Sequence, residues 1–423
     1  MLDVLRQDSY RRLFSAQVIA LLGTGLLTVA LGLLAFDLAG ADAGLVLGAA
    51  LTIKMLAYVG VAPVVSAITG RIARKKLLVG ADVARAAVAL TLPFVDDVWQ
   101  VYVMIFVLQA ASATFTPAFQ AVIPEVLPDE GQYTRALSLS RLAYDLEALV
   151  SPALAAALLT VMSYHDLFVG TFVGFVGSAL LVLATTFPPP APVTAAPFLD
   201  RLTRGSRIFW RVRELRSLLF LNLVVASSTA MVVVNTVVLV QARLERPQTD
   251  VAILLAAYGG GSMVVALCLP KVLDRSSDRT VMLSGATVLP VALVVVAVVT
   301  GIGVGVGPSQ WFALVGAWAA LGAATALVLT PSSRLVRRAS GEAHRPAVFA
   351  AQFSLSHACF IVTYPAAGTL GATVGLSWTA AVLAVVGAGA LIAARLTWPA
   401  QADGLRAAGS TSLSHPLPRD LHR

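Results

Sequence analysis

The chain has 423 residues, of which 58% are hydrophobic and only 12% are charged, and its formal net charge is +8. Soluble domains carry about 25% charged residues, so this chain lacks the polar side chains needed to cover a water-exposed surface of its size. The lysines and arginines fall between apolar runs and not on one basic face, which argues against nucleic-acid binding. Both cysteines lie inside apolar runs, which excludes a disulfide framework and a zinc knuckle.

Twelve mainly apolar runs follow one another along the chain, and each is long enough to cross a bilayer as a helix. They are residues 13–37, 44–69, 77–95, 99–120, 134–161, 166–187, 217–241, 250–270, 280–299, 309–331, 346–371 and 374–396. The ninth run is rich in valine, but in lipid only a helix or a closed barrel satisfies the backbone, and no run alternates as barrel strands do. We therefore predict an all-α membrane protein with twelve transmembrane helices.

The loops between the runs differ in charge on the two sides of the membrane. One side carries most of the basic residues, namely Arg71, Arg74, Lys75, Lys76, Arg201, Arg204, Arg207, Arg211, Arg213, Arg216, Lys271, Arg275, Arg279, Arg334, Arg337, Arg338 and Arg345. The other side carries aspartates, with Arg243 and Arg246 as exceptions. Short basic loops remain in the cytoplasm. An even number of spans then predicts a multi-pass membrane protein with both termini in the cytoplasm. The membrane that we expect is the plasma (bacterial inner) membrane.

A polar segment divides the chain into two sets of six runs. It begins with three consecutive prolines and continues with apolar residues interleaved with arginines, which we interpret as an amphipathic helix at the inner membrane surface. A merely solvated basic linker is the alternative. The predicted organisation is a six-helix bundle over 1–187, a cytoplasmic linker over 188–216, a second six-helix bundle over 217–397 and a disordered tail over 398–423.

Two loop motifs carry a resemblance to a known family. The loop SAITGRIARKK resembles the cytoplasmic signature of the major facilitator superfamily at Arg71, Arg74 and Lys75, although Gly70 replaces an acidic residue. The equivalent loop of the second half, PKVLDRSSDR, retains an Asp-Arg pair. Two six-helix halves joined by a cytoplasmic loop are also the layout of this superfamily. The stretch PAFQAVIPEVLPDEGQYTRALSLSRLAYDLEALVSP is similar to the branch that contains drug, macrolide, siderophore and nickel-resistance exporters.

The resemblance implies proton-coupled export of a drug-like or siderophore-like small molecule by alternating access. No Walker loop, catalytic triad or zinc spacing occurs, so we expect no enzymatic activity, no cofactor and no metal site. The expected partners are the substrate, protons and the lipid bilayer, without nucleic acid, and the chain is expected to act as a monomer. Two alternatives stay open: a divalent-metal exporter of the nickel type, and a membrane sensor or scaffold that has the fold but does not transport.

Ionisable residues inside apolar runs are costly and are therefore functional candidates. In the fifth run, Arg141 and Asp145 are four positions apart and can pair on one helix face. Glu147 lies on another face with Tyr144, and without a cation it could exchange a proton near neutral pH. We predict that Glu147 is the proton-coupling acid and that Arg141–Asp145 is a structural or gating pair. The alternative places all three in a wet cytoplasmic vestibule.

The remaining candidates fall into two sets. The predicted substrate cavity contains Lys54, Tyr58, Tyr144, His357, Tyr364 and Asn235. In that set Lys54 would attract an anion or pair with a carboxylate such as Asp37 or Glu147, and His357 would contact the pore, bond another helix or bind a metal. Asn235 would face the pore or join helices. The predicted gating residues are Arg71, Arg74, Lys75, Asp82, Arg85, Asp274 and Arg275.

Overall fold

The structure is a computed structural model that describes residues 2–39, 43–68, 72–187, 197–301 and 307–398. Within these ranges the chain forms thirteen α-helices and no strand. They are α1 (Asp8–Ala39), α2 (Ala43–Ile68), α3 (Arg74–Thr91), α4 (Val98–Val126), α5 (Glu130–Leu158), α6 (Tyr164–Leu183), α7 (Phe198–Arg211), α8 (Arg213–Val237), α9 (Gln248–Leu273), α10 (Asp278–Gly301), α11 (Pro308–Ala339), α12 (Arg345–Thr373) and α13 (Leu376–Thr397). The predicted tail beyond residue 398, the three prolines of the linker and Arg71 lie outside the described residues.

Eleven helices of the described chain are long and apolar enough to cross a membrane, which confirms the predicted all-α membrane fold. The twelfth long helix, α5, has 29 residues but carries more charges, including Arg141, Asp145 and Glu147. The valine-rich run is the helix α10, where Val291, Val294 and Val298 are each at least half exposed. Residues three and four positions apart share a helix face, and an apolar face of this kind is stable against lipid.

Local signals at the helix ends explain where several helices begin. The Asp129 carboxylate accepts a hydrogen bond from the backbone N–H of Gln132 at 2.8 Å and thereby caps α5. Asp166 accepts one from the backbone N–H of Ser163 at 2.9 Å at the start of α6. Between α12 and α13, Gly375 has a φ of +88°, a conformation that a residue with a side chain rarely adopts.

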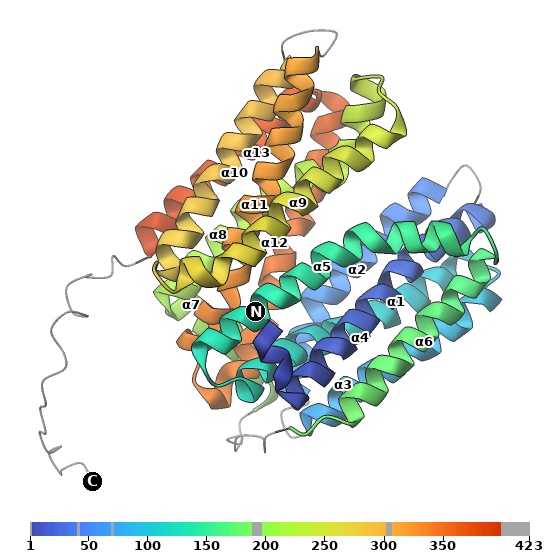
Figure 1. The fold of residues 1–423 in the computed structure, drawn as a ribbon, viewed down its shortest axis with the longest axis vertical. Coiled ribbons are helices and arrows are strands. Elements are labelled where there is room, and N and C mark those ends of the chain that lie inside the picture. The colour runs from blue at the N-terminus through green and yellow to red at the C-terminus, as the bar shows by residue number, and fades with distance from the viewer. Residues whose placement is uncertain (1, 40–42, 69–71, 188–196, 302–306, 399–423) are drawn as a thin grey trace, which may run out of the picture.

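The long helices form two groups, α1–α6 and α8–α13, which we call the first and the second half. Within each half the helices contact mainly one another, and the halves meet through α2 and α4 against α12 and through α5 against α9 and α11. The two halves lie close together at one end of the molecule and diverge toward the other (Figure 1). The short helix α7 contacts helices of both halves, namely α2, α8 and α12.

Glycines let α9 and α11 approach closely within the second half. A Cβ on Gly322 would lie 2.7 Å from the carbonyl carbon of Tyr258, and one on Gly261 would lie 2.9 Å from that of Ala319. Neighbouring Trp318 is fully buried and its indole Nε1 donates to the Thr236 hydroxyl at 3.0 Å. Small residues at such crossings allow the backbone contact on which helix packing in lipid depends.

The arginine-bearing helix ends gather at one end of the molecule, which we call the basic end. It contains the start of α3 at Arg74, the start of α5 at Glu130 and the end of α11 at Arg338. The described hydrogen bonds and ion pairs that join the halves lie between this end and the middle of the molecule. At the opposite end, polar contacts stay within one half, as in the Tyr164 hydroxyl donating to Asp37 at 2.7 Å. Within the described residues, polar contacts therefore join the two halves at the basic end and not at the opposite end.

Candidate functional site

Lys54, Tyr58, Phe353 and His357, which we call the central group, lie midway along α2 and α12, two helices that pack against each other. The Lys54 ammonium lies 5.6 Å from the centroid of the Tyr58 ring. The Tyr58 ring meets His357 edge-on at 4.7 Å between centroids and contacts Phe353 at 4.9 Å. The hydroxyl of Ser354 donates to the Val59 carbonyl at 2.5 Å, which ties the same two helices together. The sequence therefore identified three residues that the fold brings together, Lys54, Tyr58 and His357.

Glu147 lies on the α1 side of this central group and is partly buried. Its Oε1 lies 2.8 Å from the place that a Cβ on Gly25 would occupy, and the hydroxyl of buried Ser151 crowds the same position. Among the described residues Glu147 forms no ion pair, and Lys54 is the cation close enough to act on its charge. The charge of Lys54 thus acts on the Glu147 carboxylate, although no ion pair joins the two among the described residues. Tyr144, predicted for the same cavity, is 38% exposed and lies near Glu147 and Tyr58.

The predicted pairing of Arg141 with Asp145 is confirmed, and it extends to the other half. Arg141 Nη2 lies 3.0 Å from Asp145 Oδ1. Ser262 of α9 joins the pair, because its hydroxyl accepts from Arg141 Nε at 2.9 Å and donates to Asp145 Oδ2 at 2.6 Å. Sequence analysis did not identify Ser262, since one serine in an apolar run carries no signal of its partner. The three residues form a polar bridge between α5 and α9.

The polar residues of α12 bond to separate backbone carbonyls. His357 Nδ1 lies 2.7 Å from the Phe353 carbonyl, whereas the Cys359 thiol lies 3.5 Å from the Leu355 carbonyl. No group of three or more His, Cys, Asp or Glu side chains able to hold a metal ion occurs in the described part of the chain. The charge of Lys54 also acts on His357, and a neighbouring ammonium repels a divalent cation. Tyr364 packs against Phe360, with 4.9 Å between the ring centroids.

The structure does not place Asn235 with the central group. This side chain is 2% exposed, and its Nδ2 donates to the Ala367 carbonyl of α12 at 3.2 Å. Its Oδ1 would lie 2.8 Å from a Cβ on Gly371. Asn235 therefore joins α8 to α12 inside the second half, as in the second of its two predicted roles, and its place in the substrate cavity stays a prediction.

Asp82 and Arg85 form an ion pair inside the first half. Both side chains of the pair are nearly or fully buried. The Ser178 hydroxyl donates to Asp82 Oδ2 at 2.8 Å, and the Arg85 guanidinium lies 4.3 Å from the Phe115 ring centroid and 4.6 Å from that of Phe175. These contacts join α3, α4 and α6. The pair thus stabilises the packing of the first half, and the gating role predicted for it stays a prediction.

The signature loop of the first half is also anchored within that half. Arg74 pairs with Glu125 of α4, and the Lys75 ammonium donates to the Leu183 carbonyl at the end of α6 at 2.7 Å. In the second half, Asp274 and Arg275 are exposed at the end of α9. The gating role predicted for these loops stays a prediction.

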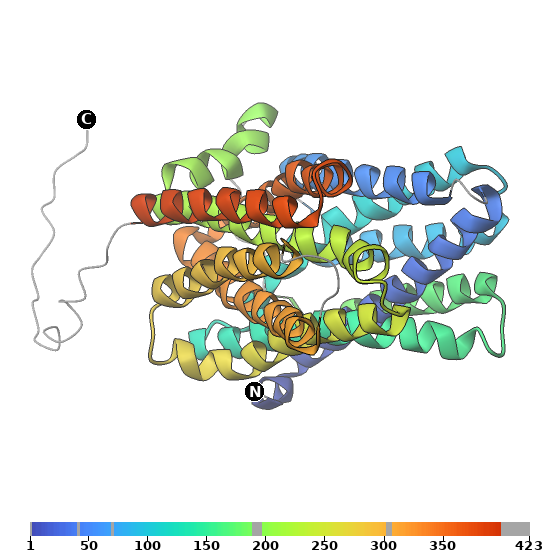
Figure 2. The same ribbon diagram turned by 90° about the horizontal axis from the view of Figure 1, so that it is seen from above.

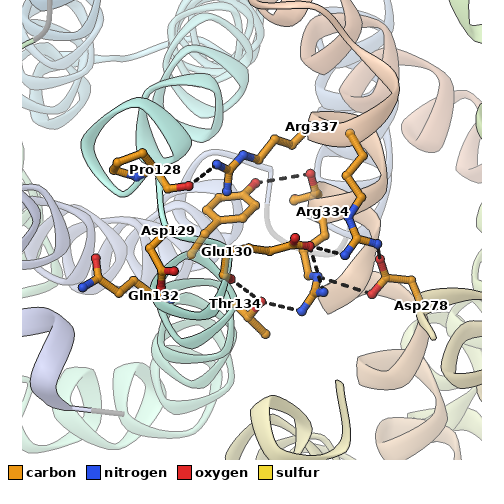
Figure 3. Close-up of polar contacts among 11 residues, drawn as sticks. Pro128, Asp129, Glu130, Gln132, Thr134, Asp278, Arg334 and Arg337 are labelled. Atoms are coloured by element: carbon orange, nitrogen blue, oxygen red, sulfur yellow. Dashed lines mark hydrogen bonds and ion pairs between the residues drawn. The ribbon is translucent and has the colours of Figure 1, made fainter. Parts of the chain in front are cut away.

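A cluster of ion pairs at the basic end joins the halves directly, and we call it the basic-end cluster (Figure 3). Glu130 at the start of α5 pairs with Arg338 and, at 3.0 Å, with Arg334, both on α11. Arg334 also donates to the Thr134 hydroxyl at 2.5 Å. Both arginines reach Asp278 of α10, at 3.3 Å from Arg334 Nε and 2.5 Å from Arg338 Nη1. The cluster therefore bridges α5 of the first half and α10–α11 of the second.

A second set of contacts next to the cluster strengthens the same junction. The Tyr133 hydroxyl donates to the Ser333 carbonyl at 3.3 Å, and the Arg337 guanidinium lies 4.9 Å from the Tyr133 ring centroid while it donates to the Pro128 carbonyl. From the sequence, these arginines were expected in a basic cytoplasmic loop, and no partner was predicted for them. Their only sequence signal was a charge at a helix terminus, which does not specify a partner.

Comparison with known proteins identifies the class. The family model of the major facilitator superfamily matches residues 13–300. The chain therefore belongs to the major facilitator superfamily, and it is a multi-pass membrane transporter.

Curated relatives cover only parts of the chain. It is 30% identical to macrolide efflux protein A of Enterococcus faecalis over 152 residues, which are 34% of this chain and 47% of that protein. It is 28% identical to macrolide efflux protein A of Streptococcus pyogenes over 181 residues, which are 42% of this chain and 44% of that protein. The match thus spans less than half the length of these relatives.

Solved structures agree on the fold. The crystal structure of the human organic anion transporter MFSD10 superimposes with a TM-score of 0.75 at 12% identity, covering 92% of this chain and 99% of that one. The fucose:proton symporter FucP of E. coli gives 0.72 at 13% identity, covering 92% and 98%. A bacterial homologue of the iron transporter ferroportin in an outward-facing state gives 0.70 at 12% identity, with the same coverage. At these identities the likeness concerns the fold alone.

Proposed function

We propose that this transporter is a proton-coupled exporter that moves a bulky, drug-like molecule out of the cytoplasm by alternating access. The relatives named for macrolide efflux support export and make macrolides the first substrate class to test. The proposal places the basic end in the cytoplasm of a bacterial inner membrane, because basic loops are retained on that side. The structure would then represent the outward-open state, closed by the basic-end cluster.

The observation that carries the proposal is the position of Glu147. This carboxylate is partly buried beside Gly25 and has no ion-pair partner among the described residues, so it can take up a proton without first breaking a salt bridge. Lys54 faces it from α2, and protonation of Glu147 would remove their mutual attraction. In the outward-open state Glu147 would accept a proton as the substrate leaves. In the inward-open state it would release the proton and allow new substrate to bind.

The lining of the central group suggests what the substrate must offer. Tyr58, Phe353 and His357 present aromatic surface, which suits a large apolar body, whereas Glu147 and Lys54 provide one charge of each sign. A metal exporter is less well supported, because the described residues offer no set of three metal ligands at this place. The experiment below also distinguishes a transporter from the third alternative, a protein that binds a molecule but does not transport it.

The test uses everted membrane vesicles with an imposed proton gradient, in which a radiolabelled macrolide is supplied from the cytoplasmic face. We expect substrate-dependent dissipation of the gradient by the wild-type protein and its loss in Glu147→Gln. Glu342→Gln is the matched control, because Glu342 is 81% exposed and lies outside the central group. Undiminished proton exchange by Glu147→Gln would remove Glu147 as the coupling acid. Substrate binding without uptake by the wild type would favour the non-transporting alternative.

A further inference from the structure

The linker helix α7 forms a basic pocket that none of the transport contacts uses. The pocket has a volume of about 430 Å³ and is lined by Arg204, Arg207, Arg211, Asp200, Ile208 and His344. Three arginines against one aspartate leave a net charge of +2 with the histidine neutral. A pocket of this charge selects an anion, and guanidinium groups bind phosphate oxygens with two parallel hydrogen bonds.

The arginines are held in place on one face of α7. Asp200 pairs with Arg204 and with Arg207, which also donates to the Asp200 carbonyl at 3.0 Å. Positions 200, 204, 207 and 211 recur at the spacing of one helix face. Among the described residues no carboxylate pairs with Arg211, so its charge remains available at the end of this row. The aspartate orients two arginines without neutralising all three.

The opposite side of α7 is fixed to the body of the protein. A Cβ on Gly205 would lie 2.8 Å from the carbonyl carbon of Ala347 in α12, and Phe209 is fully buried. This close packing brings His344, just before α12, to the arginine row. The pocket is therefore built from two elements and is not a loose charged surface.

A third face of α7 shows which anion the pocket would meet. Leu199 is 70% exposed and Trp210 is 58% exposed. They are eleven positions apart, or about three helical turns, and so lie on one face beside the arginine row. α7 lies at the periphery of the molecule (Figure 2). An exposed tryptophan next to arginines, at the basic end of a membrane protein, is typical of the headgroup region of a bilayer.

We propose that the α7 pocket binds the phosphate of an anionic phospholipid headgroup, with Trp210 and Leu199 seated in the adjoining lipid. Arg211 provides the unpaired charge and Arg204 and Arg207 provide oriented donors. Because α7 contacts α2 of the first half and α8 and α12 of the second, the headgroup is bound where the two halves meet. This site does not depend on which substrate is transported.

The experiment measures lipid binding to the purified full-length protein in zwitterionic phosphatidylcholine nanodiscs by native mass spectrometry and thermal unfolding, with dioctanoyl phosphatidylglycerol as the probe. We expect retention of bound phosphatidylglycerol and a rise in Tm that equal concentrations of dioctanoyl phosphatidylcholine do not produce. Arg211→Gln should weaken binding about tenfold, as expected for the loss of one charge-assisted contact. Arg213→Gln is the matched control, because Arg213 is an exposed arginine only two positions away that does not line the pocket.

Three results would overturn the proposal. Equal weakening by Arg211→Gln and Arg213→Gln would show a diffuse charge effect and not a pocket. An equal rise in Tm with the same concentration of inorganic phosphate would identify a free-anion site and not a lipid site. Unchanged binding in the double variant Arg207→Gln/Arg211→Gln, with a Tm in phosphatidylcholine equal to that of the wild type, would exclude the pocket altogether.

Discussion

Glu130 connects the two halves at the basic end, and Glu130→Gln should shift the protein away from the closed-basic-end conformation. Glu130 pairs with Arg334 and Arg338 across the interface, whereas Asp278 pairs with the same arginines inside the second half. The substitution therefore removes the charge from the inter-half pairs and leaves the contacts within the second half in place. The side chain of Glu130 is 48% exposed, so solvent screens both pairs.

The magnitude follows from this exposure. A half-exposed ion pair contributes about 0.2–1 kcal/mol, so two pairs contribute about 0.4–2 kcal/mol. This free energy corresponds to a change of about two- to thirtyfold in the ratio of the two conformations. High salt should produce part of the same shift in the wild type, because the screening length falls to about 3 Å at 1 M salt. The variant should respond less to salt.

The assay is electron–electron double resonance between spin labels at positions 161 and 374, in a background with Cys268 and Cys359 replaced by serine. Val161 and Val374 are 79% and 50% exposed, and they lie in opposite halves at the end remote from the basic-end cluster. Glu130→Gln should deplete the long-distance population, and Glu342→Gln should leave it unchanged. If both variants and the wild type give the same distance distribution, the basic-end cluster does not hold the halves together.

Three further predictions concern stability. Gly322→Ala should lower Tm, because its Cβ would overpack against Tyr258 at a cost of about 1–3 kcal/mol. Gly316→Ala on the same helix should leave Tm unchanged, because no atom lies within 4 Å of the added Cβ, and equal Tm values for the two variants would refute the glycine contact. Arg85→Gln should destabilise the protein by about 3–5 kcal/mol in thermal unfolding, because it leaves the fully buried Asp82 unpaired. The double variant Asp82→Asn/Arg85→Gln should recover part of this loss, and strictly additive effects of the two substitutions would contradict the pairing. Hydrogen bonds from Arg204 and Arg207 lower the pKa of Asp200 from 3.8 to about 2, so the stabilisation by these bonds is complete above pH about 4 and is lost as the pH falls toward 2. The Tm difference between wild type and Asp200→Asn should be constant from pH 8 to 5 and shrink below pH 4. A Tm difference that grows with acid would be inconsistent with these hydrogen bonds.

The sequence by itself determined the helices, their number and the local pair on α5. Each apolar run is long enough to span lipid, and a bilayer leaves the backbone no alternative to the helix at that length. The pairing of Arg141 with Asp145 could be predicted because residues four positions apart on a helix are neighbours whatever the rest of the fold does. Lys54, Tyr58 and His357 could be selected because polar groups are rare inside apolar runs.

Only the tertiary structure decided which of these side chains meet. Glu130 and Arg338 are separated by 208 positions, and nothing in the spacing of either says that α5 lies against α11. Asp82 and Arg85 were predicted as gating residues, and only the packing of α3 against α4 and α6 shows that Arg85 lies between Phe115 and Phe175. Spacing along one helix fixes which residues share its face, whereas the neighbour of that face is set by the packing of all the helices together.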